Sequence, residues 1–196
     1  MQPSSRTLPL FALAALALVA LPPGAHAQGY DPSAQIAAQK TAMRVLSKLD
    51  GTWRGKARIL GMDGKWTEHA QTERVGTTLD SALKLIEGRG YDANGKLVFH
   101  AVATLGYDAR KKAYAFRTNS RGEIGDFAFT ASDSGFVWEI PTPAFTMRYT
   151  AVIRDGRWHE VGDRIFKEGQ PVRSFEMDVT RVGDTDWPAG GAVPPR

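Results

Sequence analysis

Three histidines, His69, His100 and His159, are the candidate ligands for a metal or a haem. No two of them lie at a spacing that would place both on one metal ion, and the chain has no cysteine, which excludes thiol catalysis and thiolate metal sites. His100 lies in an apolar run, where a buried histidine with a hydrogen-bond partner is expected. His159 stands on a late strand between Trp158 and Glu160. The sequence predicts no cofactor and no metal, with a haem held by His159 as the alternative.

Residues for nucleophilic or acid–base catalysis are not arranged in a known pattern. There is no Gly-x-Ser-x-Gly turn and no His-Glu-x-x-His helix. The neighbouring carboxylates Glu68 and Glu73, and likewise Glu176 and Asp178, fit exposed strand positions better than a buried acid. We therefore expect a binding protein, although a barrel that converts a small molecule stays open.

Arginines and aromatic residues that alternate along the later strands could hold a ligand. Arginine suits a carboxylate head group, and Arg164 belongs with the arginines that could serve in this way. The predicted ligand contacts are Arg117, Arg148, Tyr114, Phe116, Trp138 and Tyr149. The alternative is that the arginines face outward in ion pairs and that the aromatic rings fill the core.

The first 27 residues have the pattern of a signal peptide. Arg6 gives a positive start, residues 10–21 form an apolar run, and Ala25-His26-Ala27 is a small-residue cleavage site. The run is shorter than the roughly 20 residues of a membrane span, so no transmembrane segment is expected in the mature protein. The sequence predicts export, to the periplasm or beyond the cell. The formal net charge of the whole chain is only +4, which argues against nucleic acid as a partner.

Residues 28–50 are predicted to form one helix that packs on the rest of the domain. Pro32 suits the first turn, with Asp31 as a possible cap. Apolar residues on one face of this helix are Ala38, Ala42, Val45, Leu46 and Leu49. Lys40, Arg44 and Lys48 follow on the opposite face, which we expect to be solvated.

Residues 51–182 are predicted to form one all-β domain. Recurrent Asp-Gly, Asn-Gly and Ser-Gly turn signals divide this region into ten short strands: roughly 52–60, 66–75, 82–91, 96–107, 112–119, 125–131, 135–140, 144–154, 157–167 and 171–182. Apolar and polar residues alternate in many of them, which is typical of an antiparallel sheet with one buried face. Closure into an up-and-down barrel would leave no free edge. Charged positions such as Arg54, Lys56 and Arg58 argue against a barrel embedded in lipid, and residues 183–196 are expected to be a flexible tail.

The motif Gly51-Thr52-Trp53-Arg54-Gly55 stands where the predicted helix meets the first strand. A Gly-x-Trp at this point, followed by an antiparallel meander, resembles the calycins, which include lipocalins and fatty-acid-binding proteins. In that group the tryptophan packs across the closed end of the barrel and the glycine allows a tight turn into it. The whole arrangement is most similar to an uncharacterised family of secreted bacterial lipocalin-like domains. The motif also resembles that of the nitrobindin-like haem barrels, but Ala57 and Ile59 stand where that family has further glycines, and its Tyr-Pro is missing.

The resemblance implies a ligand site at the end of the barrel opposite Trp53. We expect an exported barrel that binds a small hydrophobic or amphipathic molecule without catalysis. Two alternatives stay open: a haem-binding or small-molecule-converting barrel, and a fully packed domain that serves a structural or partner-binding role. The sequence does not indicate an oligomeric state.

Overall fold

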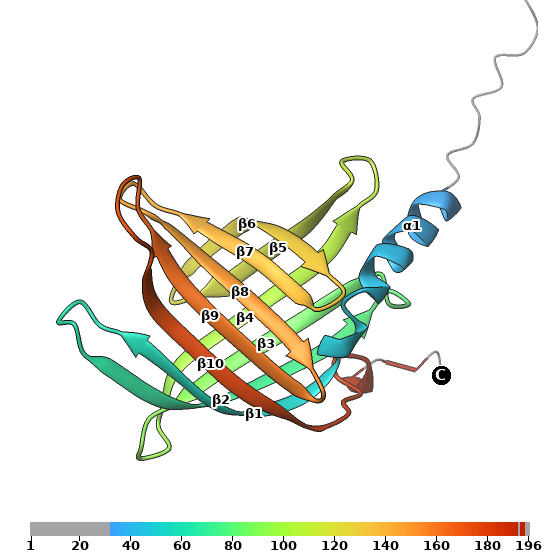
Figure 1. Cartoon of the computed structure of the whole chain (residues 1–196). Helices are drawn as coiled ribbons and strands as arrows, with labels where there is room; N and C mark the ends of the chain where they lie inside the picture. The colour runs from blue at the N-terminus through green and yellow to red at the C-terminus, as the bar shows by residue number, and fades with distance from the viewer. Residues whose placement is uncertain (1–31, 192, 195–196) are drawn as a thin grey trace, which may run out of the picture. The chain divides into compact units, whose positions relative to one another are not determined.

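A computed structural model describes residues 32–191 and 193–194 as one helix, two short 3-10 helices and ten strands (Figure 1). The proposed signal peptide and the Asp31 cap lie outside the described residues. The elements are α1 (Ser33–Arg44), η1 (Ser47–Leu49), β1 (Gly51–Leu60), β2 (Trp66–Thr78), β3 (Leu83–Tyr91), β4 (Leu97–Asp108), β5 (Ala113–Ser120), β6 (Glu123–Ser132), β7 (Gly135–Pro141), β8 (Thr146–Arg154), β9 (Arg157–Ile165), β10 (Val172–Gly183) and η2 (Ala189–Gly191).

The ten strands form a closed antiparallel barrel in which each strand pairs with its neighbours in sequence and β1 also pairs with β10. This confirms the predicted all-β, up-and-down architecture with one helix before it. The clearest differences in strand bounds lie in β2 and β6. The β2 strand runs on to Thr78, because the left-handed backbone of residues 79–81 makes the turn into β3. The β6 strand begins at Glu123, because the left-handed pair Arg121-Gly122 closes a two-residue hairpin.

Trp53 plugs the end of the barrel beside the helices. Its side chain is 1% exposed, its indole Nε1 donates to the Leu49 carbonyl at 2.9 Å, and its ring meets Trp158 edge to face at 5.8 Å. Met43, Leu46 and Leu49 are buried in the same core. A helix followed at once by a strand can therefore seal this end with its last apolar turn and the first inward side chain of the barrel.

Glycine is required on both sides of Trp53. Gly51 has a φ of +128°, a region that side-chain-bearing residues avoid. A Cβ on Gly55 would collide with the backbone carbonyl of Asp178 on β10. These two positions let β1 leave η1 sharply and approach β10 closely, which is the architectural role that the motif implied.

The helical segment is shorter than the sequence suggests. α1 ends at Arg44, the chain turns, and η1 carries it to Asp50. Val45 is 37% exposed and Ala38 is also exposed, so their predicted places on the buried face are wrong, whereas Leu46 and Leu49 are buried as predicted. Lys40 pairs with Asp80 in the β2–β3 turn, and Lys48 donates to the Asp133 carbonyl at 2.8 Å. Two of the three basic residues therefore tie the helices to the rim of the barrel.

Residues that follow β10 lie against β2. The guanidinium carbon of Arg74 sits 4.3 Å from the centre of the Trp187 ring, and η2 follows at Ala189–Gly191. Part of the region expected to be a flexible tail thus has a defined place on the outer wall of the barrel.

Candidate functional site

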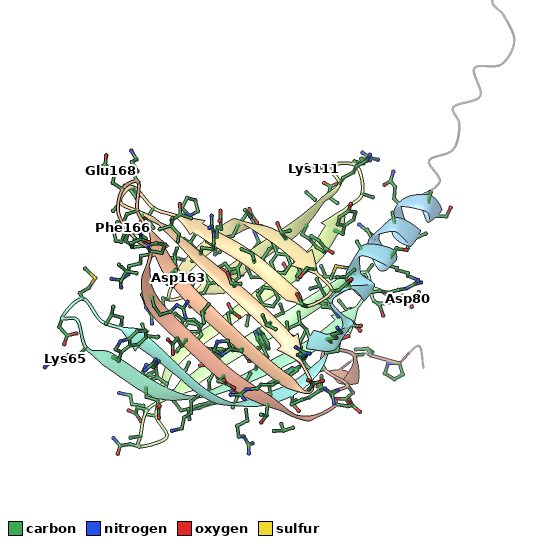
Figure 2. All side chains as sticks on the ribbon, viewed as in Figure 1. Lys65, Asp80, Lys111, Asp163, Phe166 and Glu168 are labelled. Atoms are coloured by element: carbon green, nitrogen blue, oxygen red, sulfur yellow. The ribbon has the colours of Figure 1, made fainter. Side chains whose placement is uncertain are left out.

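The barrel encloses a cavity of about 470 Å³. It reaches from Leu49 at the plugged end to Arg121 and Ile124 near the β5–β6 turn. Figures 1 and 2 show that the turns carrying Lys65 and Glu168 lie at the end opposite α1. The register places the β5–β6 turn at the same end, because each hairpin reverses the chain direction. The cavity therefore extends away from the Trp53 plug, along the inside of the strands, and we call its far end the mouth.

Aromatic side chains form most of one cavity wall. Trp138 stacks on Tyr149 with ring centres 4.2 Å apart and an interplanar angle of 8°. Phe116 meets Trp138 edge to face at 5.3 Å, and Tyr149 meets Phe175 at 5.5 Å. Each of these rings holds its neighbour, so the wall is a connected set of flat surfaces. Three of the predicted ligand contacts, Phe116, Trp138 and Tyr149, thus lie together on the cavity surface.

Tyr114 lies apart from the cavity lining. Its hydroxyl donates to the Ala42 carbonyl of α1 at 2.9 Å, and its ring packs on Tyr107 and Phe129. It joins the helix to the barrel and is not among the residues that line the cavity.

Arg117 and Arg148 are on the outer surface of the barrel. Arg117 forms a two-pronged ion pair with Asp126, with both N···O distances 2.9 Å. Arg148 bonds Glu139 at 2.7 Å. About half of each arginine side chain is exposed, 58% and 49%. Both side chains point away from the cavity, because each is next in sequence to residues that face inward.

His159 and His100 also face outward. His159 Nδ1 lies 3.3 Å from Asp178, and His100 Nε2 lies 3.0 Å from Glu87. Neither ring reaches the cavity, so neither is placed to hold a haem there. Within the described residues, no group of three or more histidine and acidic side chains is arranged to hold a metal ion.

The deep part of the cavity contains a buried carboxyl group, Glu160 on β9. Its two oxygens accept hydrogen bonds from the indoles of Trp138 and Trp158, each at 3.0 Å. Glu160 is 6% exposed. Burial raises its pKa to about 7, although the two indole donors favour the charged form. At neutral pH this carboxyl is therefore poised between its two protonation states.

A second buried carboxyl group, Glu73, lines the same cavity from β2. It is level with Trp53 in the β1–β2 pairing, and its Oε1 accepts from the Gln71 amide at 2.6 Å. Burial raises its pKa to about 8 against the effect of the Gln71 bond, and the charges of Glu160 and Glu87 raise it further. Two carboxyls that share a poorly solvated space cannot easily ionise together, so they titrate as a pair.

Gly88 on β3 makes the space for the Glu73 carboxyl. A Cβ at Gly88 would lie 2.8 Å from Oε1 and 2.9 Å from Oε2 of Glu73. The two residues are directly paired across β2 and β3. A glycine inside a strand lowers the stability of the strand, and it often marks a site where another group approaches the backbone closely. At Gly88 that group is the Glu73 carboxyl.

The mouth has an excess of positive charge, with two arginines against one glutamate, Glu123. Arg121 and Arg164 line the cavity there, and Arg164 also donates to the Leu60 carbonyl at 3.2 Å. Burial and the charge of Glu160 raise the pKa of Tyr149 to about 12, while both arginines act to lower it. Tyr149 therefore lies between the acidic deep end and the basic mouth.

His69, also on the cavity lining, has a buried Nδ1 without a hydrogen-bond partner in the described part of the chain. Such an atom usually has a water or a ligand as its partner. With Gln71 and Glu73 it forms a polar ridge along the inner face of β2.

The sequence interpretation of Glu73 is wrong, because the residue is 8% exposed and lines the cavity. The partner in that proposed pair, Glu68, is on the outer face and bonds Lys56 at 2.7 Å. Side chains whose positions in a strand differ by an odd number point to opposite faces of the sheet. That spacing shows that Glu68 and Glu73 cannot share a face, but it does not show which of the two faces inward.

No family model and no curated protein matches the sequence. The fold is similar to that of a solved structure, the crystal structure of Rv2717c from M. tuberculosis, with a TM-score of 0.55 and 12% sequence identity. The match covers 72% of this chain and 97% of that one. At this identity the likeness supports the barrel fold alone.

None of the helices in the described residues is long and apolar enough to cross a membrane.

Proposed function

We propose that this barrel binds a small, largely apolar molecule in its cavity. The observation that carries the proposal is the space itself: about 470 Å³ enclosed by aromatic and aliphatic side chains, with a few polar groups at defined points. Sites for small molecules have this size and composition. A barrel that served only as a packed scaffold would fill this space with side chains.

The site of contact is the aromatic wall and the polar groups facing it. Trp138 and Tyr149 offer the largest flat surfaces, and Phe116 closes the wall. The outward arginines Arg117 and Arg148 are not part of this proposal. We also propose that the protein acts after export, in the periplasm or outside the cell, on the strength of the signal-peptide pattern in residues 1–27.

Ligand binding can be tested by filling the cavity. Ala101 lines it from β4, so Ala101→Phe should occupy part of the space, abolish the binding of a neutral polarity-sensitive dye such as Nile red, and keep the barrel folded. Ala128→Phe is the matched control, because Ala128 is exposed on β6 and the new ring would point into solvent. Circular dichroism would verify the fold of both variants. Equal dye binding by the wild type and Ala101→Phe would contradict binding in the cavity.

Native mass spectrometry supplies a second test that does not depend on a chosen probe. Protein purified under mild conditions should carry an additional small mass that organic solvent extracts. Ala101→Phe should carry less of it than Ala128→Phe. If the wild type and both variants carry the same mass, that molecule lies outside the cavity.

A further inference from the structure

Several carboxylates on the outside of this barrel pair with arginines, whereas the two carboxyls in the deep cavity do not. Outer carboxylates such as Asp126, Glu139 and Asp178 each bond an arginine. Glu73 and Glu160 form no ion pair within the described residues. A buried carboxyl without a cation is costly to the fold. The cost is explained if a ligand supplies the missing positive charge.

The two deep carboxyls differ in how many of their oxygens already accept a hydrogen bond, although each carboxylate oxygen can accept more than one. The Glu160 oxygens accept the two indole N–H groups, which fixes the carboxyl plane. Glu73 Oε1 accepts from Gln71, while Oε2 has no hydrogen-bond partner among the residues that the structure describes. Glu73 is more than nine-tenths buried, and it lines the cavity. One acceptor atom of a well-buried carboxyl is thus available to whatever occupies the cavity.

The position of the arginines argues for one orientation of the occupant. Arg121 and Arg164 are at the mouth, and the two carboxyls are toward the Trp53 end. A ligand with an anionic head would find its partners only at the mouth. A ligand with a cationic head can place that head at the deep end and its apolar part along Phe116, Trp138 and Tyr149.

We propose that the cavity takes an organic cation, a primary amine or related protonated nitrogen base with an apolar body, whose N–H groups donate to Glu73 and Glu160. This inference deepens the proposed function and depends on it. The nitrogen supplies donors and positive charge to two acceptors that have no cation of their own. Its apolar body is buried by the aromatic wall, which gives most of the affinity.

The test compares three probes with the same eight-carbon chain: octylamine, octanol and octanoate. Binding is followed at neutral pH through the fluorescence of Trp138 and Trp158, which line the cavity. A hydrogen bond to a charged group favours octylamine over octanol by about tenfold or more, and octanoate should be the weakest. If octanoate or octanol binds as tightly as octylamine, the cation assignment is overturned while ligand binding stands. If none of the three binds, the proposed function fails, and the inference fails with it.

Two variants test whether the preference for octylamine over octanol depends on the Glu73 carboxyl. Glu73→Gln keeps the size of the side chain and should remove about tenfold of the octylamine affinity, with octanol binding nearly unchanged. Glu68→Gln on the outer face of the same strand is the matched control and should change neither. An unchanged octylamine preference in Glu73→Gln would overturn the role of this residue. The comparison of probes on the wild type stays valid even if a variant folds poorly.

Proton release gives a readout that a purely structural role of Glu73 would not produce. Calorimetric titrations near neutral pH, in two buffers with different ionisation enthalpies, should show protons leaving on octylamine binding and none on octanol binding. The titratable and charged groups that line the whole cavity are Glu73, Glu160, His69, Tyr149, Glu123, Arg121 and Arg164, and Glu87 acts through the wall. The release should fall in Glu73→Gln. Equal proton release with octanol and octylamine would contradict a cation held by these carboxyls.

Discussion

Replacing Glu73 by glutamine should change how the stability of the barrel depends on pH. The pKa of Glu73 is about 8 in the folded protein, against an ordinary value of 4.5. The folded protein therefore binds this proton more tightly than the unfolded chain does. Between these two pKa values stability falls as the pH rises, and above about 8 the loss is complete. Glutamine has the same shape and does not titrate, so the variant escapes this loss.

The size of the effect follows from the same two values. The difference between them corresponds to at most about 5 kcal/mol of unfolding free energy. Water that enters the cavity stabilises the ionised form, so we expect about 3–5 kcal/mol. Glu73→Gln should match the wild type near pH 4.5 and exceed it by that amount near pH 9.

Urea unfolding of the wild type, Glu73→Gln and Glu68→Gln across this pH range measures the effect. The other groups titrate in each protein, so the difference between variant and wild type reports residue 73 together with its coupling to Glu160. Glu68→Gln removes a carboxylate that is 58% exposed and should give a small difference with no dependence on pH. If the difference between Glu73→Gln and the wild type is the same at both ends of the range, Glu73 is not a buried acid with a raised pKa.

Three further substitutions examine the parts of the barrel that position the cavity. Trp53→Ala should lower the free energy of unfolding by about 3–5 kcal/mol, because it empties the plug; a loss below about 1 kcal/mol in urea would mean that the end is not tightly packed. Gly88→Ala should cost about 1–3 kcal/mol through its collision with the Glu73 carboxyl. That cost should shrink when Glu73→Ala is present as well, and strict additivity in this double-mutant cycle would refute the contact. Arg117→Ala removes an exposed ion pair and should change the free energy of unfolding by at most about 1 kcal/mol. It should leave the affinity for the probes unchanged. A marked loss of affinity would show that Arg117 contributes to the ligand site.

The closed barrel was predictable because local signals agree along the whole chain. The turn residues set the strand lengths, and apolar alternation in β6, β8 and β10 defines an inner and an outer face. The same alternation could have excluded two of the proposed contacts. Arg148 stands between Met147 and Tyr149, and Arg117 follows Phe116, so both arginines must point outward once the apolar residues point inward.

The acidic end of the cavity could not be inferred in the same way. Much of β2 is polar on both faces, from Glu68 to Arg74, so no apolar pattern shows which residues face inward. The pairing of β2 with β1 determines which of its side chains face inward, because Trp53 lies opposite Glu73. The volume of the cavity is equally invisible in the sequence, because it depends on which inward positions hold small residues such as Gly88 and Ala101.

The Trp53 motif and the proposed ligand site are mechanically linked through Trp158. The Trp53 ring packs against Trp158 at an interplanar angle of 87°, and the same Trp158 indole donates to Glu160 at 3.0 Å. Trp53 therefore holds the Trp158 ring in place, and the Trp158 ring in turn holds the Glu160 carboxyl. A flexible acid in an apolar chamber would turn toward water at the mouth, whereas Glu160 is held by two indole donors and stays at depth. The residues that close one end of the barrel therefore also determine where charge can reside inside it.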